Sequence, residues 1–418
     1  MAQPPTRAPL RSVTGRLAGS AALLSLSAAS VSLATFISIP IILGVLGAQL
    51  WVSIAVGQAL GELARVVIIW GWNSIGLTVV SSLDPRERLT YYFASLPPRL
   101  LLLAAAGGAA AATAATIPTQ DRAAAAVMAF AASIYGLSGG WVFIGGKEPL
   151  MMVLCDAVPR ALSIVAAAMA VLLFRTPLAF PLTTVVGTTL AVLVPFVVLR
   201  RRAARADVPF APDVRGIPRR LKEGWPAFVS AFVLSLRLLG PVILAPVIVP
   251  AASAAVALGD KFLRWSNTAM TPFMQTLQVH IPKGAGTLER RITRGIGAAW
   301  AMGLALGAAV ALVVPPVSGL LSHGEIHLPH TLSIPLGVVV LSIFVSAITG
   351  NSALVLLGRV RQVMASAICG LAVMAVTFPL MAGRWGATGA FWGLAMAEVA
   401  VMVWQFTAVA IALRGKAS

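Results

Sequence analysis

Charged residues are scarce in this sequence of 418 residues. Asp, Glu, Lys and Arg together make up 11% of it, whereas a soluble domain usually has about 25%. Hydrophobic residues make up 59%, and a soluble chain of this length could not bury that much apolar surface. The scarcity of charge excludes a soluble globular protein and predicts a helical protein that crosses a membrane several times.

Acidic residues and cysteines are especially few. Thirteen residues are acidic and 31 are Lys or Arg, so the net charge is +18. Basic residues that fix membrane topology account for this excess, and no basic soluble domain with interleaved aromatics exists to bind nucleic acid. The two cysteines, Cys155 and Cys369, follow no metal-binding or redox spacing, and we expect both to be small buried hydrophobic side chains.

Motifs of enzymatic chemistry are missing as well. The sequence has no P-loop, nucleophile elbow, paired-cysteine site or dinucleotide fingerprint. His323, Glu325, His327 and His330 offer metal-ligand chemistry in one short stretch. A glycine and a proline inside that stretch oppose the regular helix that would align them, so an ordinary polar loop is the preferred interpretation. We predict no enzyme, no catalytic residue, no metal site and no cofactor.

Apolar runs long enough to cross a bilayer as helices occur twelve times, six in each half of the chain. They cover about 20–47, 52–79, 100–117, 123–142, 150–174, 179–199, 225–247, 251–281, 296–314, 332–357, 363–381 and 387–413. The first run is too long for the core of a signal peptide, so we expect it to remain as a span. We predict an all-α membrane protein of about twelve transmembrane helices: a six-helix bundle (1–199), a cytoplasmic linker (200–224) and a second six-helix bundle (225–418) around a central cavity.

The positions of Lys and Arg alternate with the predicted spans. Most of the 31 fall at the termini or in the even-numbered gaps, as Arg86, Arg99 and Lys147 do. The odd-numbered gaps hold only Arg122 and Arg175 in the first half and Arg384 in the second. By the positive-inside rule, both termini are predicted to be cytoplasmic.

Two distant stretches carry nearly the same motif. Ala-Leu-Gly followed by an acid ends at Glu62 with Arg65 close behind, and recurs at Asp260 with Arg264 close behind. The two copies lie roughly 200 residues apart, close to half the chain, and transporters built from two similar halves place their site between the repeats. Two interpretations remain open: the charges line a shared aqueous cavity, or each acid neutralises its own arginine one helical turn away.

Nine ionisable residues fall inside the predicted spans, where each costs about 2.5–3.5 kcal/mol on insertion scales and needs a partner or water. Asp156 and Arg160 are four residues apart, and we expect them to neutralise each other. Basic residues outnumber acidic ones by one, which suits an anionic passenger better than a cationic one. The set comprises Arg65, Arg160, Arg237, Lys261, Arg264, Glu62, Asp156, Asp260 and Glu398.

Arg237 lies near the middle of the seventh predicted span, with no acidic residue within four positions. A guanidinium at this depth faces water or an anion such as phosphate, or else finds an interhelical partner such as Glu398. Prolines at 40 in the first span and 241 in the seventh either bend during transport or form static kinks. We predict substrate-binding roles for Arg65, Arg237, Arg264 and Lys261, and charge-pairing or coupling roles for Glu62, Asp260 and Glu398.

Three segments resemble a known family. The first is Leu-Gly-Val-Leu-Gly at 43–47, leading to Gly-Trp-Asn-Ser at 71–74. The second is Leu-Lys-Glu-Gly-Trp-Pro at 221–226, running through the Asp260 motif to Gln275 and Pro282, and the third is Gly-Ala-Thr-Gly-Ala at 386–390, followed by Glu398. Through these segments, nearly the whole chain resembles the polysaccharide flippase branch of the multidrug/oligosaccharidyl-lipid/polysaccharide exporter superfamily.

The resemblance implies two six-helix bundles around a V-shaped cavity in the bacterial cytoplasmic membrane. It implies that the chain moves an undecaprenyl-diphosphate-linked oligosaccharide to the outer leaflet. By that analogy Arg65, Arg237 and Arg264 contact phosphate or an acidic sugar. The expected partners are a lipid-linked anionic glycan, membrane lipids and other membrane proteins of polysaccharide assembly. The chain departs from the family at Gly240 and Pro241, where many members carry a polar or acidic residue.

Other functions remain as alternatives. A cation-coupled multidrug exporter of the same superfamily normally has a membrane carboxylate in its first or seventh span, and neither predicted span has one. The peptidoglycan-precursor flippase branch usually has fourteen spans, which twelve fit poorly. A polysaccharide polymerase or ligase needs a large external loop, whereas the predicted external gaps are short. A non-transporting membrane scaffold is the last alternative.

Overall fold

The computed structural model describes residues 10–209, 216–283 and 287–414. Nearly all of these residues are helical, and none of them lies in a strand. Nine helices of the described chain are long and apolar enough to cross a membrane. The chain is therefore a multi-pass helical membrane protein, as its composition predicts.

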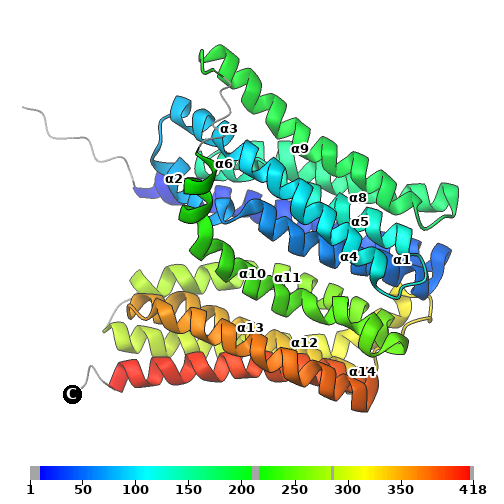
Figure 1. The fold of residues 1–418 in the computed structure, drawn as a ribbon. Helices are drawn as coiled ribbons and strands as arrows, with labels where there is room; N and C mark the ends of the chain where they lie inside the picture. Colours follow the sequence, from blue (N-terminus) through cyan, green and yellow to red (C-terminus); the bar gives the residue numbers. More distant parts are fainter. Residues whose placement is uncertain (1–9, 210–215, 284–286, 415–418) are drawn as a thin grey trace, which may run out of the picture.

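The helices fall into two groups that are far apart in sequence (Figure 1). The first group contains α1 (Leu10–Ile69), η1 (Trp72–Gly76), α2 (Leu77–Ser82), α3 (Pro85–Leu102), η2 (Leu103–Gly107), α4 (Gly108–Thr116), α5 (Arg122–Ile134), η3 (Tyr135–Leu137), α6 (Gly140–Gly145), α7 (Pro149–Met152), η4 (Val153–Ala157), α8 (Val158–Phe174) and α9 (Ala179–Arg205). The second contains α10 (Ile217–Ile248), η5 (Pro250–Ala252), α11 (Ser253–Lys283), α12 (Leu288–Leu321), α13 (His330–Ile348), η6 (Thr349–Leu354) and α14 (Val360–Arg414).

Two of the long helices are sharply bent at a glycine. Gly47 inside α1 has φ 78°, and Gly386 inside α14 has φ 59°. Both angles lie in the left-handed region, which side chains with a Cβ disfavour, so a glycine is needed at each bend. Each of these helices therefore consists of two straight parts joined at the bend. The 31-residue α11 is not among the nine apolar helices, and it carries Asp260, Lys261 and Arg264.

Several predicted span boundaries differ from the helices. The second predicted span ends at 79, but α1 ends at Ile69, because Trp70 (φ 45°) and Gly71 (φ 84°) turn the chain. The third predicted span begins at 100, but α3 begins at Pro85, where the Asp84 carboxylate accepts hydrogen bonds from two backbone N–H groups of the first turn. The predicted linker, 200–224, lies partly outside the described residues; α9 continues into it to Arg205 and α10 begins within it at Ile217.

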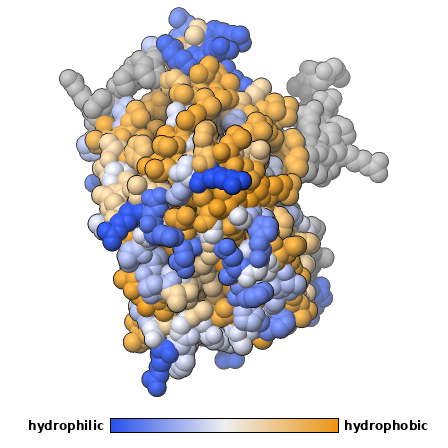
Figure 2. Space-filling view, turned by 90° about the vertical axis from the view of Figure 1, so that its right-hand side faces the viewer, coloured by the Kyte–Doolittle hydropathy of each residue, from blue (hydrophilic) through white to orange (hydrophobic). Residues whose placement is uncertain are grey.

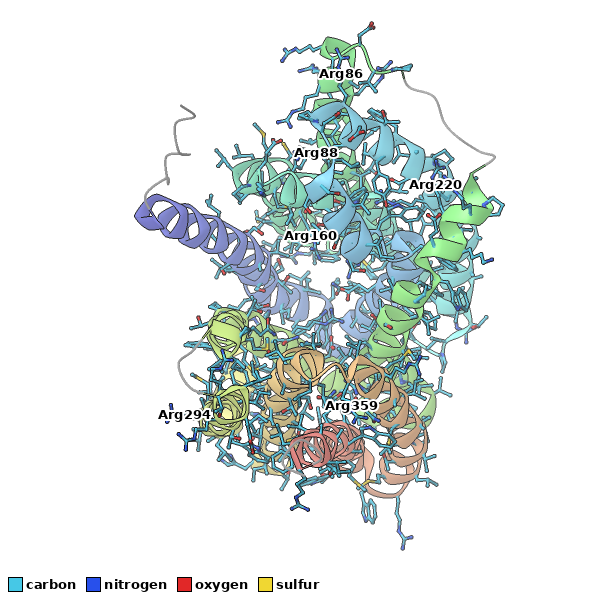
Figure 3. The ribbon with its side chains drawn as sticks, turned by 90° about the vertical axis from the view of Figure 1, so that its left-hand side faces the viewer. Arg86, Arg88, Arg160, Arg220, Arg294 and Arg359 are labelled. Carbon is cyan, nitrogen blue, oxygen red and sulfur yellow. The ribbon has the colours of Figure 1, made fainter. Side chains whose placement is uncertain are left out.

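The start of α10 packs against the end of α1. The Trp70 and Phe228 rings stack with their centroids 4.0 Å apart, and the Trp70 indole donates a hydrogen bond of 2.8 Å to the Leu221 carbonyl. A Cβ at Gly224 would lie 2.6 Å from the Trp70 carbonyl oxygen, so only glycine permits this approach. We call this end of the molecule the basic end, because it carries Arg86, Arg88, Arg220, Arg294 and Arg359 (Figure 3).

The two groups also meet at the opposite end, where the loop between α12 and α13 reaches the bend in α1. The Ala48 N–H donates a hydrogen bond of 2.7 Å to Glu325 Oε2, and His323 Nε2 lies 3.2 Å from the Pro40 carbonyl oxygen. We call these two contacts the end latch. Figure 2 shows this end of the molecule face on, with the side chains of the described residues packed over it.

Candidate substrate-binding cavity

A cavity of about 450 Å³ lies between the two groups of helices. We call it the central cavity. From α1 it is lined by hydroxyl side chains at helical spacing, among them Ser32 and Thr35, and from α11 by Thr268 and Thr271. Ser32 and Thr268 hydrogen-bond across the cavity wall with their oxygens 3.2 Å apart. The rest of its lining comes from η3, α7, η4 and α8.

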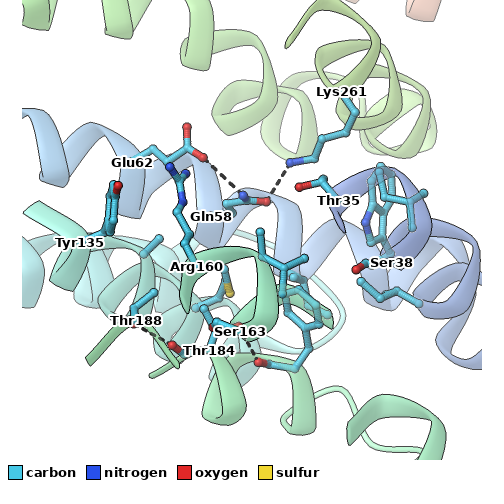
Figure 4. Close-up of a pocket in the computed structure, with 18 of the residues that line it drawn as sticks. Thr35, Ser38, Gln58, Glu62, Tyr135, Arg160, Ser163, Thr184, Thr188 and Lys261 are labelled. Carbon is cyan, nitrogen blue, oxygen red and sulfur yellow. Dashed lines mark hydrogen bonds between the residues drawn. The ribbon is translucent and has the colours of Figure 1, made fainter. Parts of the chain in front are cut away.

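The two repeated motifs meet at this cavity. Arg264 of α11 contacts Glu62 of α1 at 2.5 Å and Asp260 of its own helix at 2.7 Å. The Lys261 ammonium donates a hydrogen bond of 2.7 Å to Gln58, whose amide donates to Glu62 at 3.3 Å (Figure 4). Both interpretations of the motifs therefore hold for Arg264, which pairs within its helix and also between the two groups. About a third of its side chain, 36%, stays exposed beside the cavity.

Arg65 lies apart from Arg264. It lines a smaller adjoining pocket of about 80 Å³, which shares Gln58, Glu62 and Lys261 with the central cavity. The guanidinium of Arg65 lies 5.9 Å from the centre of the Tyr135 ring. Its buried Nε has no hydrogen-bond partner among the described residues. The expectation that both arginines line one cavity therefore holds for Arg264 alone, although the two pockets adjoin.

Arg160 belongs to the site and forms no direct ion pair with its predicted partner in the described chain. Among the described residues no ion pair joins Arg160 to Asp156; the Asp156 carboxylate instead accepts hydrogen bonds of 2.5 Å from the hydroxyls of Tyr135 and Ser138. The prediction of that ion pair is wrong because Asp156 lies in the π-helical turn η4, which changes the spacing that aligns residues four apart. The Arg160 guanidinium lies 4.4 Å from the centre of the Tyr135 ring and points toward Glu62 (Figure 4).

Arg237 pairs with Glu398, the interhelical partner that the sequence offered as one of two alternatives. Its Nε lies 3.0 Å from Glu398 Oε1, and the two side chains are 7% and 1% exposed. The contact lacks hydrogen-bond geometry, since Arg237 Nε and both Glu398 carboxylate oxygens count as buried atoms without a hydrogen-bond partner in the described chain. This pair stands away from the Arg264 cluster, at a second cavity.

The second cavity has a volume of about 850 Å³ and is lined almost entirely by α10, α11, α13, η6 and α14. We call it the C-terminal cavity. Arg237 and Glu398 both line it, and Asn267 and Thr271 line it together with the central cavity. The two cavities therefore share one wall on α11. The C-terminal cavity extends to Val360, the first residue of α14, and so reaches toward the basic end.

Sequence reasoning missed three residues near these charges. Gln58 lies one turn before Glu62 on the same helix, and that spacing is a signal that could have found it. Tyr135, one of only three tyrosines, gave no signal, because tertiary packing brings its ring to Arg160. Arg99 was counted among the topology-setting cations of a gap, but it is 1% exposed and donates hydrogen bonds to the Gly136 and Ser138 carbonyls at 2.6 and 2.7 Å.

The cluster around the central cavity is cationic overall. Four basic side chains and three carboxylates gather there, which leaves one positive charge in excess. Arg264 can reach a ligand, because its side chain is partly exposed beside the cavity. A cavity of this kind, between two halves of a membrane protein, is suited to an anionic headgroup. The cluster comprises Arg65, Arg160, Lys261, Arg264, Glu62, Asp156 and Asp260.

No family model matches the sequence, and no curated protein matches it. Solved structures do match. A lipid II flippase, MurJ in an inward closed conformation, superposes with a TM-score of 0.70 at 9% identity, over 93% of this chain and 87% of its own. An inward-facing multidrug resistance MATE family transporter of the MOP superfamily gives 0.58 at 15% identity, over 95% and 94%. The MATE multidrug transporter DinF-BH, in a ligand complex, gives 0.54 at 15% identity, over 97% of each chain.

These similarities show the fold. The chain has the fold of these proteins, one of which is named as a member of the MOP superfamily. The matched proteins are named as a flippase and as transporters. The highest TM-score of the three is with the lipid II flippase MurJ.

Proposed function

We propose that this protein is a MOP superfamily transporter that moves a polyprenyl-diphosphate-linked oligosaccharide from the cytoplasmic to the outer leaflet of a bacterial cytoplasmic membrane, for cell-surface polysaccharide synthesis. In this proposal α1 and α14 each cross the membrane twice, because each bends at a glycine. Because two of the nine apolar helices cross twice, these nine give eleven spans, and α11 adds the twelfth. The spans then form two six-helix bundles. The basic end faces the cytoplasm by the positive-inside rule.

The observation that carries the proposal is the position of Arg264. Its guanidinium joins the two groups of helices through Glu62, is partly exposed beside the central cavity, and lies in a cluster with an excess positive charge. A planar guanidinium binds phosphate oxygens in pairs, which a diphosphate supplies. The hydroxyl side chains along α1 and α11 offer hydrogen bonds to a polar headgroup.

The same contacts supply a way to couple binding to movement. Glu62 contacts Arg264 and ties α1 to α11. A diphosphate bound at Arg264 and Lys261 competes with Glu62 for these cations. Binding therefore weakens a contact between the halves, which is the differential interaction that a conformational change requires. While the diphosphate binds, the end latch holds the two groups of helices together at the end opposite the basic end.

Export of hydrophobic drugs is the second candidate, and two observations favour it. Two of the matched structures are multidrug transporters, and most residues of α10 and α14 that line the C-terminal cavity are apolar. The charge balance of the central cluster opposes a cationic drug. Binding experiments separate these candidates.

We expect purified protein in detergent to bind undecaprenyl diphosphate, and Arg264→Gln to bind it roughly tenfold to a hundredfold more weakly, because losing a hydrogen bond to a charged group costs about 1.5–3 kcal/mol. Native mass spectrometry measures both affinities. Arg294→Gln removes an exposed arginine far from the cavity and serves as the matched control. A melting curve for each variant reports whether it is folded.

Two results would contradict the proposal. The first is an Arg264→Gln protein that binds undecaprenyl diphosphate as tightly as the unmodified protein does. The second is an unmodified protein that binds the hydrophobic cationic dye ethidium but not the diphosphate lipid, which would support the drug exporter instead.

A further inference from the structure

The C-terminal cavity has two unlike walls. The wall formed by α11 and η6 carries amide side chains, among them Asn267, Gln278 and Asn351. Apart from Ser230 and Arg237, the wall formed by α10 and the first part of α14 is aliphatic, with Leu234 and Met364 among its residues. A ligand that fills this cavity therefore meets hydrogen-bonding groups on one side and hydrocarbon on the other.

The aliphatic wall is also an outer surface of the molecule. Leu234, Met364, Ile368 and Val360 line the cavity, yet each is between 44% and 56% exposed. Figure 1 shows the reason, since α10 leads away from α14 toward the basic end and packs against the first group of helices. Between these two helices the cavity faces the side of the protein, where the bilayer lies.

We call the boundary between α10 and α14 the seam. It is closed in the part farther from the basic end. A Cβ at Gly240 would lie 2.9 Å from the Met374 side chain, and one at Gly370 would lie 2.7 Å from Arg237 Nη1. These glycines allow the helices to touch, and the ion pair of Arg237 with Glu398 lies at the same depth. The opening between the helices is therefore limited to the part nearer the basic end.

The face of the central cavity between the two groups of helices has the wrong chemistry for hydrocarbon. Where α1 faces α11, the central cavity is bordered by the hydroxyls of Ser32, Thr35 and Thr268 and by Arg264. Placing a hydrocarbon chain against these groups would take water from them without offering hydrogen bonds, which costs free energy. The aliphatic seam of α10 and α14 imposes no such cost.

The two cavities are close enough for one amphiphile to occupy both. Asn267 and Thr271 border both cavities, and they follow Arg264 by three and seven residues on α11. At 1.5 Å per residue these positions lie about 4.5 and 10 Å along the helix from Arg264. A headgroup at Arg264 therefore lies within about three helical turns of residues that line the C-terminal cavity.

We propose that the seam between α10 and α14 is a lateral portal, through which the hydrocarbon chain of the substrate passes from the C-terminal cavity into the bilayer while its diphosphate binds at Arg264. This inference rests on the proposed function, and it adds the path of the lipid chain. The amide wall lies beside the part of the headgroup nearest the chain. The portal and the charged site together select a lipid that carries an anionic headgroup.

Photocrosslinking tests the path of the chain. The photoreactive residue p-benzoylphenylalanine is placed at Met364 in the portal, at Ser32 on that face of the central cavity, or at Leu320, an outward side chain that is 76% exposed and lines neither cavity. The probe is radiolabelled undecaprenyl-diphosphate-linked N-acetylglucosamine in nanodiscs. We expect crosslinking at Met364 that unlabelled probe competes away, at least fivefold above that at Leu320, and lowered when Arg264→Gln is added.

The outcomes separate the two proposals. Competable crosslinking at Ser32 and not at Met364 would overturn the portal and leave the proposed function standing. Crosslinking at Met364 that is unaffected by competitor reflects bulk lipid and would also overturn the portal. No competable crosslinking at any site would overturn the proposed function and the portal with it.

Blocking the portal gives a functional test. Ala367 lines the C-terminal cavity on α14, and Ala375 lies exposed on the same helix outside both cavities. We expect Ala367→Trp to slow transport of the same probe in vesicles at least tenfold, and Ala375→Trp to transport normally. Leu234→Trp, on the facing helix, replaces Ala367→Trp if that variant melts at a lower temperature. Normal transport by a folded, portal-filling variant would overturn the inference.

Discussion

At the scale of single residues, the pair of Arg237 and Glu398 is the most completely buried ion pair of the described chain. Each charge is tolerated inside the protein only because the other is 3.0 Å away. Removing one partner leaves an uncompensated buried charge, whereas removing both leaves an apolar contact. The stability of single and double variants therefore reports the role of Arg237.

We expect Arg237→Leu to lower the free energy of unfolding by about 3–5 kcal/mol, the usual cost of breaking a buried pair. The double variant Arg237→Leu with Glu398→Leu should recover most of that loss. Thermal melting of the purified proteins in detergent measures both changes. An Arg237→Leu protein that melts normally but no longer transports would instead support the interpretation of Arg237 as a substrate ligand.

The sequence predicts some of the site's residues well and others not at all. Glu62, Asp260 and Arg264 could be found because a motif repeated at half the chain length puts them at equivalent places in the two halves. The surroundings of Asp156 and Arg160 could not be predicted. Their relative orientation depends on a π-helical turn that hydropathy and spacing do not reveal.

At the scale of elements, the loop between α12 and α13 is built to hold the end latch. The Ser318 hydroxyl accepts from the Leu328 N–H at 3.1 Å, and the Ser322 hydroxyl accepts from the Ile326 N–H at 3.0 Å. Glu325 thereby reaches the first N–H after the bend in α1, where a helix N-terminus favours a negative charge by about 0.3–1 kcal/mol. In the proposed function, an outward-open state requires this contact to break.

We expect Glu325→Ala to shift the protein toward that state, because it removes a contact made only while the end is closed. A cysteine at Ile42, which is buried in the pocket behind the latch, should then react with a membrane-impermeant thiol reagent about fivefold faster, the effect of losing about 1 kcal/mol. The background carries alanine in place of Cys155, which is buried, and of Cys369, which is half-buried and not buried as predicted.

Glu289→Ala, which removes an exposed carboxylate from the first turn of α12, is the control for this change. Its Ile42 cysteine should react at the unmodified rate. Equal rates for both variants would mean that Glu325 does not hold this end of the molecule closed.

Elements could be predicted from the sequence where hydropathy alone decides them. Long apolar runs mark most of the helices, because a helix in lipid must present apolar side chains all round. The start of α3 at Pro85 was missed because its first turns are polar and depend on an Asp84 cap. The bends at Gly47 and Gly386 depend on single φ angles, and a glycine in a sequence does not reveal which angle it adopts.

At the scale of the whole molecule, charge is distributed unevenly along its length. Five arginines labelled in Figure 3 mark the basic end, and the two cavities lie between that end and the latch. In the proposed function, a substrate headgroup approaches through this positive field, reaches Arg264 and stops at the end held by the latch. That order of features is the one that the proposal requires of an inward-facing state.

Transport of a lipid between leaflets is the measurement that tests the account most directly. Vesicles containing the purified protein carry fluorescent undecaprenyl-diphosphate-linked N-acetylglucosamine in one leaflet, and a membrane-impermeant quencher reports its arrival in the other. We expect the protein to speed this movement above the rate in protein-free vesicles, and Arg264→Gln to lower the accelerated rate at least tenfold. Equal rates with and without the protein would contradict the central claim that this chain transports a diphosphate-linked lipid.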